Sequence, residues 1–418
     1  MKYLTDLIYK KDGVKIYPIS SHYKDPNNNP KFPSNITITH FQGQQIINTR
    51  LTDYCYIPVP SSEICQYVTI CQDHHKISSI NTIQKLNENQ SNITYQLIGN
   101  ESVVLGNGIS YCGLEDVRLI VWNDILYGIG FRPDIIEGKV IAQLIEYNDD
   151  LSINKSWFIN TDKEMEKNWQ PVEAKPFTFM YDPSTSSIIT LDIENLQVAD
   201  NNEKPTIINY IETPEYTGNL SGSSQLMRVD DGWISICHQS RRWFGADGLI
   251  RWVYDHYFVG YNEDLSIKFI SKPFRFVGDC MEFCCGLCKD DETNTSYISF
   301  SILDGSTHVI EMNLDILINI IERFVDETTP DMKPTYDYIY DTYNTDKLIS
   351  TDRLSVAFLL ESLQILPNVE KIPDIINCLG PMDPTIPYYK TAMLLHFIIR
   401  RPDNEPVLNY FKRHKWLH

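Results

Sequence analysis

The sequence predicts a mainly β protein: a five-bladed β-propeller with a small C-terminal α-helical domain. One observation is a near-verbatim repeat, in which Tyr147-Asn-Asp-Asp-Leu-Ser-Ile153 returns as Tyr261-Asn-Glu-Asp-Leu-Ser-Ile267, 114 residues later. The other is that each copy lies among short apolar runs separated by Asn, Asp and Gly turns, which is typical of antiparallel strands. Four-strand units that recur every ~40 to 60 residues are the pattern of propeller blades.

Five such units can be placed along the chain. Two clear units begin at Val117 and Ser223, and two less regular ones begin near Pro176 and Glu282. A first unit covers the runs QQIINTR and YCYIPV and continues toward residue 100. The last unit is one strand short, and VKIYPI at residues 14–19 is predicted to complete it. The alternative is a series of β-sandwiches, which do not need a near-identical repeat at a two-unit offset.

The pattern changes after residue 325. Residues 1–325 are assigned to the propeller, and residues 326–350 form a linker rich in Pro, Asp and Tyr. Apolar residues at helical spacing predict an α-helical appendage over residues 351–418. The appendage either packs on the propeller or binds a partner, including a second copy of the chain.

Composition narrows the function classes. The formal net charge of −19 over 418 residues disfavours binding to nucleic acid or anionic lipid. We find no signal peptide and no membrane span, and ten cysteines in such a chain are expected to be reduced, which predicts a cytoplasmic protein. The 25 Tyr and 7 Trp favour surfaces that stack on sugar rings. The sequon at Asn35 is then interpreted as part of an Asn-rich loop.

Acidic residues stand at the predicted starts of three blades. Because the innermost strands line the channel of a propeller, these acids are expected to meet around one axis. The three segments are Glu115-Asp116-Val117-Arg118, Glu166 to Lys175, and Met281-Glu282-Phe283. Glycosidic chemistry needs a carboxyl group that exchanges a proton at the bridging oxygen, and clustered carboxylates raise one another's pKa. One such acid beside an arginine is more often a structural ion pair, but three at equivalent places favour a carbohydrate site.

These motifs resemble glycoside hydrolase family 130, over roughly residues 40–310. The segment at 115–118 is similar to the Glu-Asp-Pro-Arg signature of that family. Residues 166–168 with Pro171 and Lys175 are similar to its Asp-Lys-Asn and Phe-Pro-Glu-Lys block, and residues 47–50 look like a first-blade motif. The family comprises five-bladed propellers that include β-mannoside phosphorylases, and related β-1,2-mannosyltransferases share the scaffold. Two departures are Val117 in place of the proline, and Cys237-His238-Gln239 in place of His-Gly-Val.

The resemblance and the blade positions together give the expected site. Asp116 is expected to be the catalytic acid/base, and Glu173 and Glu282 are candidates for second carboxylates. The residues expected to bind sugar are Arg50, Glu115, Arg118, Asn168, Trp169 and Asp304. The residues expected to bind phosphate are Lys175, His238, Arg241, Arg242 and Tyr254.

The predicted function is a carbohydrate-active enzyme that makes or breaks a β-mannoside-type bond. The altered phosphate motif favours a glycosyltransferase with a sugar-phosphate or sugar-nucleotide donor. The alternatives are a phosphorylase or hydrolase of oligomannosides, and a non-catalytic propeller that binds glycan or protein. No cofactor is expected.

Two further segments carry expectations. Residues 238–248 are predicted to be a long basic and aromatic loop, which either folds over the channel and binds a phosphate or diphosphate or is a plain surface loop. It is followed by a strand with Tyr254 and His256 on one face and Tyr257 on the other. A zinc site is not predicted at Cys280, Cys284, Cys285 and Cys288, because neighbours in a strand point to opposite faces.

Overall fold

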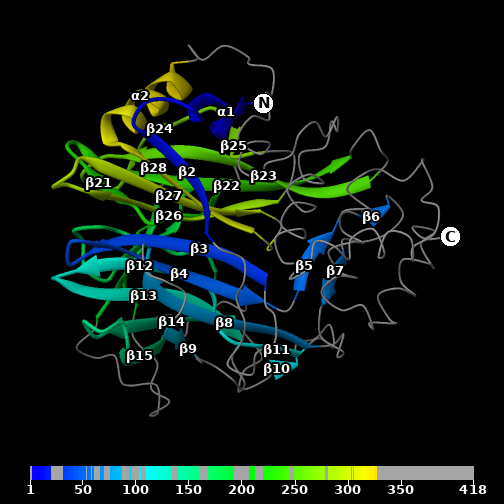
Figure 1. Ribbon diagram of the computed structural model, residues 1–418. Coiled ribbons are helices and arrows are strands. Elements are labelled where there is room, and N and C mark those ends of the chain that lie inside the picture. The colour runs from blue at the N-terminus through cyan, green and yellow to red at the C-terminus, as the bar shows by residue number, and fades with distance from the viewer. Residues whose placement is uncertain are drawn as a thin grey trace.

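The structure is a computed structural model, and the blades of a propeller account for most of its strands (Figure 1). It describes residues 2–19, 32–52, 54–57, 59–60, 66–69, 76–86, 94–96, 103–104, 110–133, 140–159, 167–192, 207–211, 220–244, 249–277, 281–302, 304 and 306–326. The described strands form five sheets of four or more strands and one two-stranded sheet, which confirms the five-bladed propeller. Apart from Asp326, the predicted linker and appendage lie outside these residues.

The first blade is larger than predicted. Its strands are β3 (Phe32–Phe41), β4 (Gln44–Thr52), β8 (Lys76–Lys85), β9 (Thr94–Gln96), β10 (Val103–Val104) and β11 (Ser110–Cys112). The innermost strand β3 was not predicted, because its Asn- and Thr-rich sequence lacks a continuous apolar run. The run YCYIPV was wrongly placed in this blade. It forms β5 (Tyr54–Ile57), which pairs with β7 (Gln66–Thr69), and β6 (Val59–Pro60), which pairs with the fourth blade.

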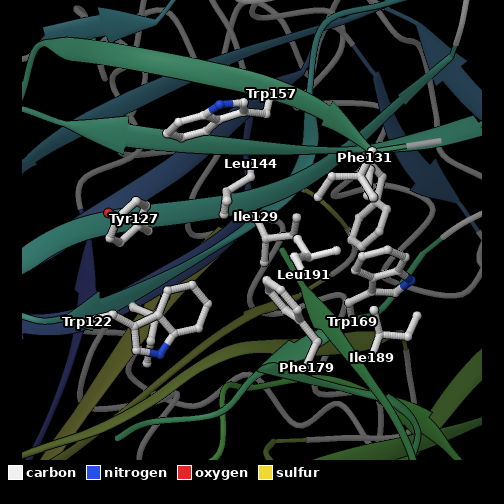
Figure 2. Close-up of a cluster of buried hydrophobic side chains, with 13 residues drawn as sticks. Trp122, Tyr127, Ile129, Phe131, Leu144, Trp157, Trp169, Phe179, Ile189 and Leu191 are labelled. Atoms are coloured by element: carbon white, nitrogen blue, oxygen red, sulfur yellow. The ribbon is translucent and has the colours of Figure 1, made fainter. Parts of the chain in front are cut away.

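The second and third blades follow the predicted order. The second contains β12 (Glu115–Trp122), β13 (Ile125–Pro133), β14 (Val140–Tyr147) and β15 (Ile153–Ile159). The third contains β16 (Gln170–Pro171), β17 (Thr178–Asp182), β18 (Ser187–Leu191) and β19 (Ile207–Ile211). An aromatic core lies between them, in which the Phe179 ring packs 5.5 Å from Trp122 and 5.6 Å from Trp169 (Figure 2). Burial of such large rings is a major source of stability.

The fourth blade contains a hairpin that is longer than predicted. Its strands are β20 (Ser221–Gly222), β21 (Met227–Val229), β22 (Gly232–Phe244), β23 (Leu249–Tyr261) and β24 (Ile267–Ile270), with β25 (Phe274–Arg275) and β1 (Lys2–Tyr3) at its edge. The segment predicted as a loop from residue 238 stays paired up to Phe244 and Ile250. The extended hairpin reaches the segment between β4 and β8 of the first blade, where Leu249 of β23 pairs with Pro60 of β6 (Figure 1).

The N-terminal segment completes the fifth blade, as predicted. The blade consists of β26 (Glu282–Asp290), β27 (Thr295–Ile302), β28 (Ser306–Asn313) and β2 (Val14–Ile19), and β2 runs antiparallel to β28. Two helices are α1 (Leu4–Ile8) and α2 (Leu314–Val325). Helix α2 was not predicted, although Asn313 caps it by accepting a hydrogen bond from Asp315 N at 2.9 Å. No helix in the described part of the chain is long and apolar enough to cross a membrane.

The two copies of the repeat form the same turn. Asn148 N donates to Ser152 O at 2.8 Å, and Asn262 N donates to Ser266 O at 2.9 Å. In each copy an aspartate, Asp150 or Asp264, accepts a hydrogen bond from the serine amide at 2.9 Å. Local turn chemistry therefore explains why this sequence recurs.

The blades have two distinct ends. One is the end where the innermost strands β3, β12 and β26 begin, which we call the Asp116 end. The other holds the turns at residues 148–152 and 262–266, which we call the repeat end. Between the ends, Gln225 crosses the channel: its Nε2 donates to Ile38 O at 2.8 Å and its Oε1 accepts from Leu287 N at 3.1 Å. The innermost strands thus meet around one axis.

Candidate functional site

Asp116 lies at the start of β12, within a network that joins three blades. Its Oδ1 accepts hydrogen bonds from Asn35 Nδ2 at 2.6 Å and from Arg50 Nη1 at 3.0 Å. The Asp116 side chain is 22% exposed. Within the part of the chain that the structure describes, Oδ2 receives no hydrogen bond. One carboxylate oxygen is therefore fixed while the other is available to a ligand.

Two β-bulges bring these side chains together. The pairing of β12 with β13 shifts between Glu115 and Arg118, and the pairing of β3 with β4 shifts between Ser34 and Ile36. Each shift adds one residue to an innermost strand, and such bulges re-aim a side chain next to a functional site. Asp116 also has a φ of 51°, a left-handed conformation that costs about 1–2 kcal/mol for an L-residue other than glycine.

Arg50 is the central cation of the network. Its side chain is only 3% exposed, and its Nη2 donates to Glu115 Oε1 at 2.6 Å. Its Nε donates to Ser79 Oγ at 2.8 Å, on the neighbouring strand β8. The predicted grouping of Arg50 with Glu115 and Asp116 therefore matches the geometry.

Arg118 holds the backbone around Asp116 rather than its carboxylate. It is fully buried, its Nη1 donates to Asp116 O at 2.9 Å and its Nε donates to Ser223 O at 2.7 Å. Its Nη2 donates to Asn168 Oδ1 at 3.1 Å. Arg118 thereby ties the starts of three blades together and stabilises the strained Asp116 conformation.

Asp304 places a third carboxylate near Arg50. It lies in the turn between β27 and β28, is 6% exposed, and has a φ of 50°. Burial, with smaller contributions from the Asp116 and Glu115 carboxylates, raises the pKa of Asp304 to about 6 against the lowering effect of Arg50. Burial and Asp116 also raise the pKa of Glu115, against the effect of Arg50. Burial and the neighbouring acids therefore make Asp304 and Glu115 harder to ionise, while Arg50 favours their charged forms.

His238 lies on the other side of Arg118. It shares a hydrogen bond of 2.7 Å with Ser223 Oγ, and its ring stacks on Tyr254 with centroids 4.8 Å apart. Burial lowers the pKa of His238 to about 3, and Arg118 contributes to the lowering. A neutral imidazole can donate one hydrogen bond to a phosphate but adds no positive charge.

The extended hairpin carries the remaining residues expected to bind phosphate. Arg241 and Arg242 pair with Val253 and Trp252 as strand residues, and their side chains lie outside the described part of the chain. Their distance from Asp116 is therefore untested. The predicted sharing of one face by Tyr254 and His256 agrees with the contacts of both rings with His238.

Glu173 and Lys175 belong to the repeat end, which corrects the predicted convergence with Asp116. Lys175 Nζ donates to the backbone oxygen of Glu263, next to the second repeat turn, at 2.9 Å. Glu173 Oε2 accepts from Arg228 N at 2.5 Å. The reason is distance along the chain. An extended residue advances about 3.3 Å, so the segment from Asn168 to Lys175 is long enough to pass from one end of the channel to the other.

Two other predicted site residues have structural roles. Both carboxylate oxygens of the fully buried Glu282 accept backbone hydrogen bonds, from Phe276 N at 2.6 Å and Val277 N at 2.7 Å. Glu282 therefore anchors a turn and does not face a substrate as a second catalytic acid. Trp169 is completely buried between the second and third blades, so its ring offers no surface for a sugar (Figure 2).

Several polar residues of the site were not predicted. They are Asn35, Ser79, Ser223 and Ser301, each of which contacts a site residue through a side chain. Asn35 was interpreted as a loop residue, but it lies on β3 and is 6% exposed. The only sequence signal was its position just before the first blade's apolar pattern.

The cysteines are buried thiols. Burial raises the pKa of Cys284 to about 12, and raises those of Cys285 and Cys288 as well. Among the described residues, no three His, Cys, Asp or Glu side chains are grouped as metal ligands. Cys280 is not among those residues.

Comparison with known proteins gives similarities to solved structures. No protein-family model matches the chain, and no curated protein matches it. A β-1,2-mannobiose phosphorylase from Listeria innocua is 11% identical, with a TM-score of 0.40 over 75% of this chain and 94% of that one. A mannose phosphorylase from Leishmania mexicana, solved with a phosphate ion, is 11% identical, with a TM-score of 0.43 over 73% of this chain and 89% of that one.

A third structure is a GDP-Man-dependent mannosyltransferase from Leishmania mexicana. It is 12% identical, with a TM-score of 0.42 over 74% of this chain and 93% of that chain. The three names include both a phosphorylase and a transferase activity. These likenesses are weak, so the function has to be inferred from the chain's own site.

Proposed function

We propose that the protein is a carbohydrate-active enzyme that acts on a glycosidic bond, with Asp116 as its acid/base. The observation that carries the proposal is the Asp116 carboxylate: one oxygen is held by Asn35 and Arg50, and the side chain keeps 22% exposure. Asp304 supports it, because burial raises the pKa of its carboxyl to about 6, so an acid that is protonated in mildly acidic solution lies near Asp116.

The chemistry requires one proton transfer and one bond exchange. An acceptor hydroxyl gives its proton to Asp116 Oδ2 while its oxygen forms the new bond to the anomeric carbon. The donor's leaving group departs with the electron pair of the old bond. Arg50 holds the receiving carboxylate in place, and Arg118 fixes the backbone that carries it.

We favour glycosyl transfer from a sugar-phosphate or sugar-nucleotide donor over phosphorolysis. Two of the expected phosphate ligands do not gather as a cationic site at Asp116, because Lys175 contacts the repeat end and His238 is neutral. The extended hairpin with Arg241 and Arg242 is the segment we assign to the larger donor. A β-mannoside product is the proposal that follows from the sequence resemblance.

A donor panel tests this proposal. The purified chain is incubated with mannose acceptors and either a set of sugar nucleotides and sugar 1-phosphates, or an oligomannoside with phosphate. Release of nucleotide or phosphate with a lengthened acceptor supports a transferase. Formation of sugar 1-phosphate from oligomannoside identifies a phosphorylase instead, and binding of glycans without turnover of any donor contradicts an enzyme.

A further inference from the structure

Asn35 uses both polar atoms of its amide, in opposite directions. Its Nδ2 donates to Asp116 Oδ1 at 2.6 Å, and its Oδ1 accepts from Ser301 Oγ at 2.7 Å. The three residues come from three blades, and Asn35 is the extra residue of the β3 bulge. Because Asn35 is only 6% exposed, water cannot easily replace either bond.

This chain of hydrogen bonds has a fixed direction. A carboxylate oxygen is an acceptor only, so the amide nitrogen must face Asp116. The serine hydroxyl then donates to the amide oxygen, which keeps the amide from turning over. Arg50 Nη1 donates to the same Asp116 oxygen. With two donors directed at Oδ1, a proton on that oxygen would collide with both of them.

We propose that Asn35, held by Ser301, is a positioning residue that confines proton exchange of Asp116 to Oδ2. The proposal rests on the proposed function of Asp116 as acid/base. It gives the site a defined reactive oxygen, whose direction is set by the closure of the fifth blade on the first. A proton that leaves an acceptor hydroxyl then arrives at Oδ2 while Oδ1 stays hydrogen-bonded.

Asn35→Asp is the most informative variant. The variant replaces the amide that donates a hydrogen bond to Asp116 by a second carboxylate. Two adjacent carboxylates share one proton, which raises the pKa of one of them. We expect kcat to fall about 100-fold and the acidic limb of the kcat/KM pH profile to move upward by roughly one pH unit or more. A folded variant whose pH profile coincides with that of the wild type overturns the proposal.

A matched serine pair provides the second test. Ser301→Ala removes the hydroxyl that orients Asn35, whereas Ser299→Ala removes a hydroxyl on the same strand that donates to Ile36 O at 2.7 Å. Both variants lose one bond between the fifth and first blades, so we expect similar decreases in Tm. Only Ser301→Ala is expected to lower kcat, by about tenfold with KM unchanged. Equal kcat values for the two serine variants contradict the proposal. This test applies even if Asn35→Asp does not fold.

The two proposals fail differently. If Asp116→Asn retains wild-type turnover, the assignment of Asp116 as the acid/base is wrong. If Asp116→Asn is inactive while the Asn35 and Ser301 variants behave like their controls, only the positioning role is wrong.

Discussion

The two ends of the propeller are built by different means. At the repeat end, each turn is stabilised by its own residues, as in the bond from Asn148 N to Ser152 O and its counterpart from Asn262 N to Ser266 O. At the Asp116 end, the bonds join residues far apart in the chain: Asn35 and Asp116 are 81 positions apart. The turns of the repeat end are closed by local bonds and also receive bonds from Gln42 and Lys175 of other blades, whereas the Asp116 network consists mainly of bonds between blades.

The same contrast applies to charge. Arg228 pairs with Glu263 at the repeat end, where their side chains are 32% and 62% exposed. Arg50 pairs with Glu115 and Asp116 while it is only 3% exposed. Water reaches both partners of the Arg228 pair, whereas in the Arg50 pairs it reaches the acids, which are 37% and 22% exposed, but not the guanidinium. The Asp116 end should therefore be the sensitive one.

Replacement of the two arginines gives the largest expected difference in stability. Arg50→Met leaves Glu115, Asp116 and Asp304 without their shared cation. Because the Glu115 and Asp116 side chains are 37% and 22% exposed, we expect the cost to lie below that of a fully buried pair, which is about 3–5 kcal/mol. Arg228→Met removes an exposed pair and should barely change Tm. Thermal and urea unfolding of both variants measures the difference. Equal decreases in the free energy of unfolding for the two variants would contradict the proposed difference between the ends.

Replacement of Glu282 and Glu173, the two acids that were expected to be second catalytic carboxylates, tests the comparison between the two ends further. Glu282→Ala leaves the amides of Phe276 and Val277 without acceptors, at a cost of roughly 2–4 kcal/mol. Glu173→Ala removes one such bond, from Arg228 N, and should cost about 1 kcal/mol. Neither variant should lower kcat of the folded fraction. If the kcat of Glu173→Ala were more than about 100-fold below that of the wild type, Glu173 would act as a catalytic acid after all.

The buried histidines and the exposed carboxylates of the turns should affect the free energy of unfolding in different pH ranges. Burial lowers the pKa values of His238 and His308 to about 3, from 6.5. The unfolded chain thus binds more protons below pH 6.5, and stability should fall as the pH decreases from 6.5 toward 3. Asp304 acts in the opposite sense between pH 6 and 3.8, because its pKa is raised.

Acid unfolding at a series of pH values measures this prediction. The exposed turn carboxylates Asp150 and Asp264 have lowered pKa values, so their contribution disappears only below pH 3.8. A slope from pH 6.5 to 4 that is the same for the wild type and for a variant without His308 would contradict the assignment of a neutral, buried histidine at this position. His308→Phe, which keeps a ring on Phe300, should reduce the slope in this range.

The smallest effect is expected in the repeat turns. Asp150→Ala and Asp264→Ala each remove an acceptor for a serine amide and hydroxyl in an exposed turn. We expect small decreases in Tm that are equal for the two copies, since their geometry is the same. A large difference between the two would show that the different long-range partners of the turns, Gln42 at Asp149 and Lys175 at Glu263, outweigh their shared local bonds.

The sequence predicted what local pattern and blade position determine. The repeat turns, the five blades and the closing strand β2 were all predicted. Arg50 and Asp304 were expected to bind sugar, and both lie near Asp116, while their role in sugar binding stays a prediction. The expected convergence of Glu173 and Lys175 with Asp116 failed because the chain from Asn168 to Val172 runs alongside β12 from Arg118 to Trp122, so the residues after Val172 lie at the repeat end.

Other features could not be predicted because their causes are distant in the chain. The role of Asn35 depends on bulges in two strands and on Ser301 of the fifth blade. The hairpin beyond His238 looked like a loop, since Gln239, Ser240 and Arg241 lack apolar alternation. Its strands are paired nevertheless, and Leu249 and Ile250 of β23 pair with β6.

The central claim is that Asp116 exchanges a proton with the substrate. It is tested by measuring glycosyl transfer and sugar binding for the wild type, for Asp116→Asn and for Asp231→Asn, in which the replaced side chain is 85% exposed at the far end of the blade. We predict that Asp116→Asn keeps its Tm and its affinity for the sugar but loses about 10²- to 10⁴-fold in kcat, while Asp231→Asn matches the wild type. Turnover by Asp116→Asn within about twofold of the wild type would contradict the account.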